Sequence, residues 1–188
     1  MVGGDVLDLR SHETGIVRET GLKVALMSET LALIAEQMTR VNKLFLKGLE
    51  GFSETSFFTN LPNGGHSAAW HALHIADWTQ ILVPANFEGI PTDLRLGHLG
   101  WEDASWIADA TGPSPANLTD TKDAILEYLR RELERGVETV KTASADRLEA
   151  RISTPMGERV VRNLLLTQLG HVPYHYGQVK MTAKQLEH

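Results

Sequence analysis

Apolar residues recur at steps of three and four along most of this chain, and this periodicity restricts its fold more than any other feature. No segment favours a β-strand convincingly. The pattern predicts four long helices, over residues 22–49, 67–83, from Thr119 or Thr121 to 142, and 159–184. We therefore expect an all-α protein, a four-helix bundle with a long connection between its second and third helices.

The segments between these helices differ in length and in composition. Residues 1–20 are expected to form an irregular lead-in, and residues 53–65 a loop. Residues 86–119 form the long connection, which has room for a short helix over residues 101–110. Long connections in compact domains are usually functional or contain local structure. A turn at residues 154–157 is expected immediately before the fourth helix.

The length of the chain suits one domain covering residues 1–188, and 188 residues are enough to bury a sizeable core. The last three residues, 186–188, resemble the remnant of a purification tag, so His188 is left out of the functional argument.

Charge and patterning exclude several classes of function. The net charge of −6 argues against a nucleic-acid partner, because phosphate binding favours a basic surface. The sequence has no signal peptide and no apolar run of about 18 residues, so we expect a cytoplasmic protein without membrane contact. With no cysteine in the chain, a tightly bound transition metal would depend on histidine and carboxylate ligands.

The segment around His171 and His175 is the first candidate for such a site. Residues four apart lie on the same face of a helix, so the two imidazoles can approach one ion. Pro173 lies between them and should bend the helix, or break it. A third ligand is available from His71 or His74, and periodicity does not choose between them. The alternative is that these are core histidines that make ordinary hydrogen bonds, and no HExxH motif indicates a metalloprotease.

The two histidine motifs, WHALHIADW and HVPYHYGQ, resemble those of the DinB-like superfamily of metal-binding four-helix bundles. The segment TPMGERVVRNLLLTQLGH also resembles the turn and apolar run that precede the family's histidine pair. The resemblance implies that His74, His171 and His175 are the metal ligands, with His71 a neighbour. It also implies a homodimer that holds zinc, nickel, iron or another divalent ion. Related members are similar to thiol-dependent transferases and isomerases, whereas many others have no assigned reaction.

Three neutral imidazoles would leave a divalent ion its full positive charge and open coordination positions for a substrate, water or thiol. Because the chain has no thiol, a low-molecular-weight thiol would have to arrive as a cosubstrate. We therefore expect a metal-dependent transferase or isomerase acting on a small molecule. The alternatives are a non-catalytic metal- or small-ligand-binding protein related to stress, and a helical interaction protein whose histidines only pack.

Several other side chains are candidates for roles near the ion. Gln178, one turn beyond His175, is the best candidate to orient a ligand imidazole, and Asp77 is a second. Tyr174 and Tyr176 are more often structural than catalytic in such positions. The remaining candidates could line an apolar pocket but are expected mainly to pack: Trp70, Trp78, Trp101 and Trp106. The loop histidines His12, His66 and His98 are expected to be solvated.

Overall fold

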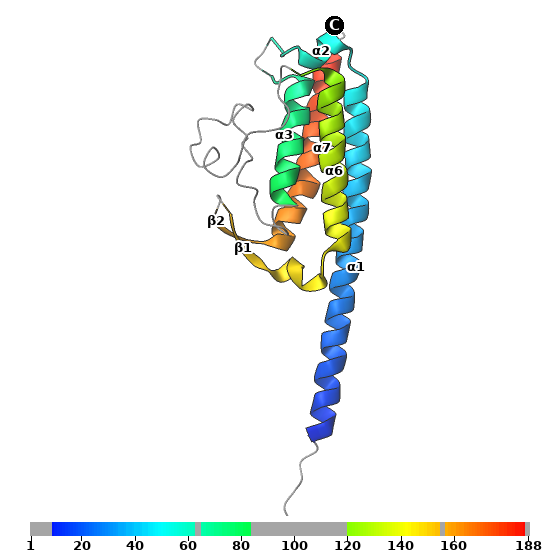
Figure 1. The fold of residues 1–188 in the computed structure, drawn as a ribbon, viewed down its shortest axis with the longest axis vertical. Helices are drawn as coiled ribbons and strands as arrows, with labels where there is room; N and C mark the ends of the chain where they lie inside the picture. The colour runs from blue at the N-terminus through cyan, green and yellow to red at the C-terminus, as the bar shows by residue number, and fades with distance from the viewer. Residues whose placement is uncertain (1–8, 63–64, 84–119, 155–156, 187–188) are drawn as a thin grey trace, which may run out of the picture.

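The computed structural model describes residues 9–62, 65–83, 120–154 and 157–186. Within these ranges four long helices form an all-α bundle (Figure 1). They are α1 (Leu9–Glu50), α3 (Ala68–Leu82), α6 (Lys122–Thr142) and α7 (Val161–Leu186). Helices α1 and α3 each pack against both α6 and α7, so α1 and α3 occupy opposite corners of the bundle. The predicted fold class is confirmed.

Four shorter elements lie between the long helices within the described ranges. Helix α2 (Glu54–Phe58) lies within the predicted loop, and the hydroxyl of Ser53 caps it by accepting from the Ser56 amide. The 3-10 helix η1 (Ala145–Glu149) follows α6. The strands β1 (Arg151–Thr154) and β2 (Gly157–Val160) then pair antiparallel, with Thr154 opposite Gly157.

Two predictions for this part of the chain were wrong, and the start of one helix is displaced. Residues 9–20 belong to helix α1 and are not an irregular lead-in. On either side of the expected turn, residues 151–154 and 157–160 form two paired strands that were not predicted, because four-residue strands are too short for alternation to be recognised. Consequently the last helix begins at Val161, two residues after the predicted start. The long connection, including Trp101, Trp106 and the expected helix 101–110, lies outside the described residues.

Capping side chains fix where α3 and α6 begin. The Ser67 hydroxyl accepts from the Trp70 amide at 3.2 Å, and the Thr121 hydroxyl accepts from the Ala124 amide at 3.3 Å. The Asn60 side chain also accepts from the backbone amide of Ser67 at 3.1 Å, which ties the start of α3 to the preceding loop. These contacts confirm the predicted starts and choose Thr121 over Thr119.

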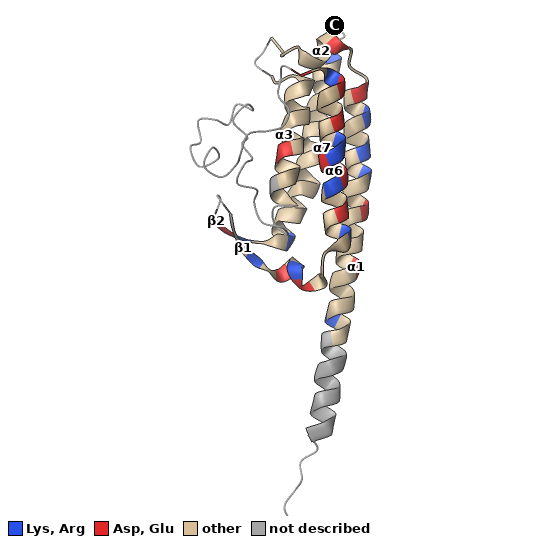
Figure 2. Ribbon diagram, viewed as in Figure 1, with Lys and Arg blue, Asp and Glu red and all other residues tan. Residues whose placement is uncertain are grey.

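Charge is unevenly distributed over the bundle. Charged residues are frequent on the outer faces of α1 and α6, whereas α3 has one acidic residue and is buried from Ala68 to Gln80 (Figure 2). A helix that is buried on all sides has no polar face, which explains why periodicity could not choose between His71 and His74. None of the described helices is long and apolar enough to cross a membrane.

Helices α3 and α6 approach each other closely at Gly136. A Cβ atom at this position would lie 2.9 Å from Cγ2 of Thr79. The Thr79 side chain cannot turn aside freely, because its hydroxyl donates to the Ile75 carbonyl at 2.6 Å and accepts from Nε2 of Gln168 at 2.6 Å. A glycine is therefore needed on α6 to keep α3 in its place.

We predict that Gly136→Ala lowers the free energy of unfolding by about 1–3 kcal/mol, because the added methyl group overpacks the α3–α6 contact. Gly177→Ala is the matched control, since a Cβ atom there meets nothing within 4 Å. The control should raise stability by about 0.5–1 kcal/mol through helix propensity alone. Urea unfolding of both variants provides the measurement, and equal stabilisation by the two substitutions would contradict the prediction.

Candidate metal centre

Helices α3 and α7 bring four histidines together inside the bundle. His71 and His74 belong to α3, whereas His171 and His175 belong to α7. His74 and His171 are 97 residues apart in the sequence. Helix α7 continues through Pro173 without a break, so both of its histidines stay on the face turned to α3. His71, His74 and His175 are buried, and His171 is half-buried.

Three of these side chains direct the same ring nitrogen to one point. Nε2 of His171 lies 3.0 Å from Nε2 of His74 and 3.0 Å from Nε2 of His175. An ion with Zn–N bonds of 2.0–2.1 Å in tetrahedral geometry places its ligand nitrogens about 3.3 Å apart. The three ligand atoms, all within 4.8 Å of one another, therefore fit a divalent ion. Sequence analysis named the same three residues.

Burial keeps these imidazoles neutral, which is the form that binds a metal. Burial lowers the pKa of His171 from 6.5 to about 4. Burial, followed by repulsion from neighbouring histidines, lowers the pKa of His175 to about 3 and moves that of His74 far below its ordinary value. Neutral imidazoles turn lone pairs toward the common point, and a cation placed there would relieve their mutual repulsion.

The fourth histidine contacts the cluster from one side. Nδ1 of His71 lies 2.9 Å from Nδ1 of His175, and burial lowers the pKa of His71 to about 4. His71 does not belong to the group of three converging ligand atoms. Its contact with His175 was not predicted. His71 and His74 are three residues apart on a buried helix, and this spacing could have indicated that both side chains lie near the same group.

The two side chains expected to orient a ligand imidazole have other environments. Gln178 is exposed, and no hydrogen bond from it to a histidine occurs among the described residues. Asp77 is buried, but it accepts a short hydrogen bond from the hydroxyl of Tyr128 on α6. Nε2 of Gln80 donates to that same hydroxyl at 2.8 Å. Asp77 therefore belongs to a polar group that links α3 to α6, which sequence analysis missed because Tyr128 is 51 residues away.

Two tryptophans form apolar walls around the histidines. The indole of Trp70 stacks on the ring of His74, with centroids 4.6 Å apart and planes inclined by 11°. Trp78 meets the ring of His171 edge to face at 6.0 Å. On its other face Trp70 stacks with His66, which is exposed as predicted. Low-dielectric walls of this kind strengthen electrostatic interactions within a site.

The two tyrosines on either side of His175, Tyr174 and Tyr176, have different environments. Tyr174 is 63% exposed and meets the ring of His175 edge to face at 5.1 Å. Tyr176 is half-buried and packs where α7 passes Gly48 of α1. His12, His98, Trp101 and Trp106 lie outside the residues whose side chains are described.

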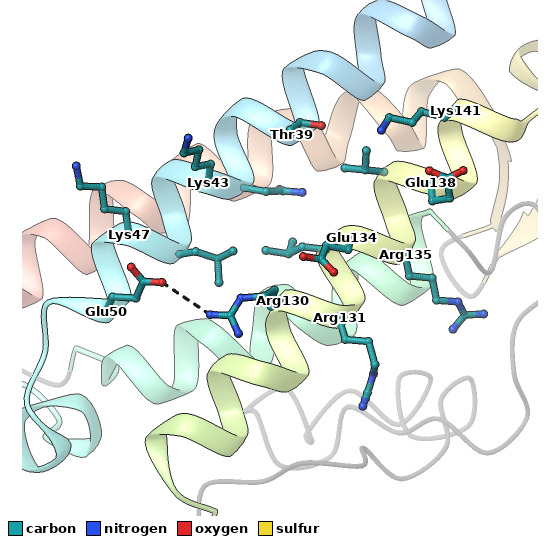
Figure 3. Close-up of a pocket in the computed structure, with 14 residues that line it drawn as sticks. Thr39, Lys43, Lys47, Glu50, Arg130, Arg131, Glu134, Arg135, Glu138 and Lys141 are labelled. Atoms are coloured by element: carbon teal, nitrogen blue, oxygen red, sulfur yellow. Dashed lines mark ion pairs between the residues drawn. The ribbon is translucent and has the colours of Figure 1, made fainter.

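The bundle also has a groove of about 900 Å³ between α1 and α6, away from the histidines (Figure 3). Its rim contains cations such as Lys43, Lys47 and Lys141 together with Glu134 and Glu138. Arg130 pairs with Glu50 across it at 3.8 Å. The groove therefore has charges of both signs facing each other and contains none of the four clustered histidines.

Comparison with known proteins supports the family resemblance. No curated protein matches this chain significantly. A family model described as the DinB superfamily matches residues 37–179, which include all four clustered histidines. The matched segment covers most of the sequence, and the chain belongs to the DinB superfamily.

Proposed function

We propose that this protein binds one divalent ion through Nε2 of His74, His171 and His175. We propose that it is a transferase or isomerase whose reaction depends on this ion. The observation that carries the proposal is the convergence of three neutral, largely buried imidazoles: Nε2 of His171 lies 3.0 Å from Nε2 of both His74 and His175, and the three ligand atoms lie within 4.8 Å of one another. Zinc, nickel and iron all suit imidazole ligands. Three histidines contribute no negative charge, so the ion would keep its full Lewis acidity.

We propose further that the reaction uses a low-molecular-weight thiol and a small electrophilic substrate. When bound, the ion would supply a positive charge that lowers the pKa of a coordinating thiol. The chain has no cysteine of its own, so the sulfur would have to come from a cosubstrate. The walls formed by Trp70 and Trp78 support this proposal, because they limit water beside the histidines.

A homodimer in the cytoplasm, without nucleic-acid or membrane partners, is the setting that we propose. Helix α1 extends beyond the bundle (Figure 1) and exposes Leu22, Leu26 and Leu33 by 64%, 55% and 57%. These positions share one helix face, which a second copy of the chain could cover. The net charge of −6 disfavours contact with phosphate backbones.

The ligand assignment predicts that His171→Ala and His175→Ala each abolish stoichiometric metal binding. His71→Ala should retain one ion per chain at saturating metal, because His71 is not one of the three converging ligands. The measurement is elemental analysis of untagged protein purified without a nickel column, since nickel could replace the native ion. One ion per chain in both alanine variants would show that the assignment is wrong, and no ion in the wild type would favour a packing role.

The proposed reaction predicts turnover when metal-loaded protein is mixed with a low-molecular-weight thiol and an electrophile. A screen that pairs several thiols with several electrophiles, followed by disappearance of the free thiol, measures it. The His171→Ala protein is the matched control and should show only the background rate. Stoichiometric metal without turnover in any pair would favour the alternative of a non-catalytic binding protein.

The dimer proposal predicts that the wild type has about twice the mass of the 20.8 kDa chain in light scattering. Leu22→Glu with Leu26→Glu should produce a monomer, because two charges would enter the apolar α1 face. Leu166→Glu, at an exposed leucine of α7, is the control and should remain dimeric. A monomeric wild type would contradict the proposal.

A further inference from the structure

His71 occupies an unusual position for a residue outside the group of converging ligands. Its side chain is 5% exposed, and its Nδ1 lies 2.9 Å from Nδ1 of His175. The other ring nitrogen of His175, Nε2, lies 3.0 Å from Nε2 of His171. His175 therefore stands between His71 on one side and the remaining ligands on the other.

The chemistry of a metal ligand determines which nitrogen of His175 can donate. A ligand imidazole is neutral and presents its lone pair to the ion, so a His175 that binds through Nε2 has its N–H at Nδ1. That N–H is buried and needs an acceptor. At 2.9 Å the acceptor is Nδ1 of His71, which must then hold a lone pair there and its own proton at Nε2.

We propose that His71 is a positioning residue, whose Nδ1 accepts the Nδ1–H of His175 and thereby fixes the tautomer and ring orientation of that ligand. The inference rests on the metal site proposed above. Such outer partners of metal-binding histidines typically change metal affinity by about 10–100-fold. Within the described structure the other expected partners do not fill this role, because Gln178 is exposed and Asp77 accepts from Tyr128.

The alternative that His71 is itself a ligand agrees less well with the geometry. Its Nδ1 is directed at Nδ1 of His175, whereas the three converging atoms are all Nε2. The rings of His71 and His175 are also tilted by 55°, with centroids 5.1 Å apart. This arrangement suits a hydrogen bond between ring edges.

The test compares zinc affinity among three variants with that of the full-length wild type, by competition with a chromogenic chelator. His71→Leu keeps an apolar side chain in the core but removes the acceptor, and should weaken zinc binding about 10–100-fold with one ion per chain retained. His71→Asn offers an amide oxygen near the position of Nδ1 and should restore affinity to within a few-fold of the wild type. His66→Asn changes an exposed neighbour that stacks on Trp70, and should leave affinity unchanged.

A second measurement separates positioning from packing. Thermal unfolding of each metal-free variant reports the packing effect, and the visible spectrum of the cobalt-loaded protein reports the ligand geometry.

Equal zinc affinity in His71→Leu and the wild type would overturn the inference while leaving the metal site intact. Loss of the ion at saturating zinc in His71→Leu alone would make His71 a ligand. Equal weakening in the Leu and Asn variants, parallel to lower metal-free stability, would assign His71 to packing. A wild type that binds no zinc would remove the proposed site itself.

Discussion

The packing of α3 against α7 is the contact on which the candidate site depends. The nitrogen atoms come from residues 97 positions apart, so the lone pairs meet only if these two helices keep their register. Two contacts maintain it. Nε2 of Gln168 on α7 donates to the hydroxyl of Thr79 on α3, and Gly136 of α6 allows α3 to sit close on the other side. A shift of α3 along α7 would therefore change the distance between Nε2 of His74 and Nε2 of His171, which is 3.0 Å.

The interior around this contact favours uncharged side chains. Three buried histidines have lowered pKa values because the charged form would lose its hydration, and the buried acid of α3, Asp77, accepts a hydrogen bond from Tyr128. No described carboxylate joins the converging ligand atoms. A cation at this point would therefore meet neutral nitrogen ligands, apolar walls and little competing charge, which is the environment in which a Lewis acid acts most strongly.

Much of this arrangement could be predicted from the sequence. Three- and four-residue steps identified the long helices, and Ser67 and Thr121 marked two of their starts, because those signals are local. The choice of His74 over His71 came from family resemblance, since the uniformly buried α3 has no polar face. Partners across the bundle could not be predicted. His71 meets His175 and Tyr128 meets Asp77 only through tertiary packing, which a single sequence does not reveal.

The central claim is that three imidazole nitrogens, and no thiolate or protein carboxylate among the described residues, hold one ion. X-ray absorption spectroscopy of the zinc-loaded, untagged protein tests this most directly, because it reports the type and distance of each ligand. The account predicts three imidazole scatterers at about 2.0–2.1 Å, with the remaining coordination from a light atom. A spectrum with fewer than three imidazoles per zinc would contradict this claim.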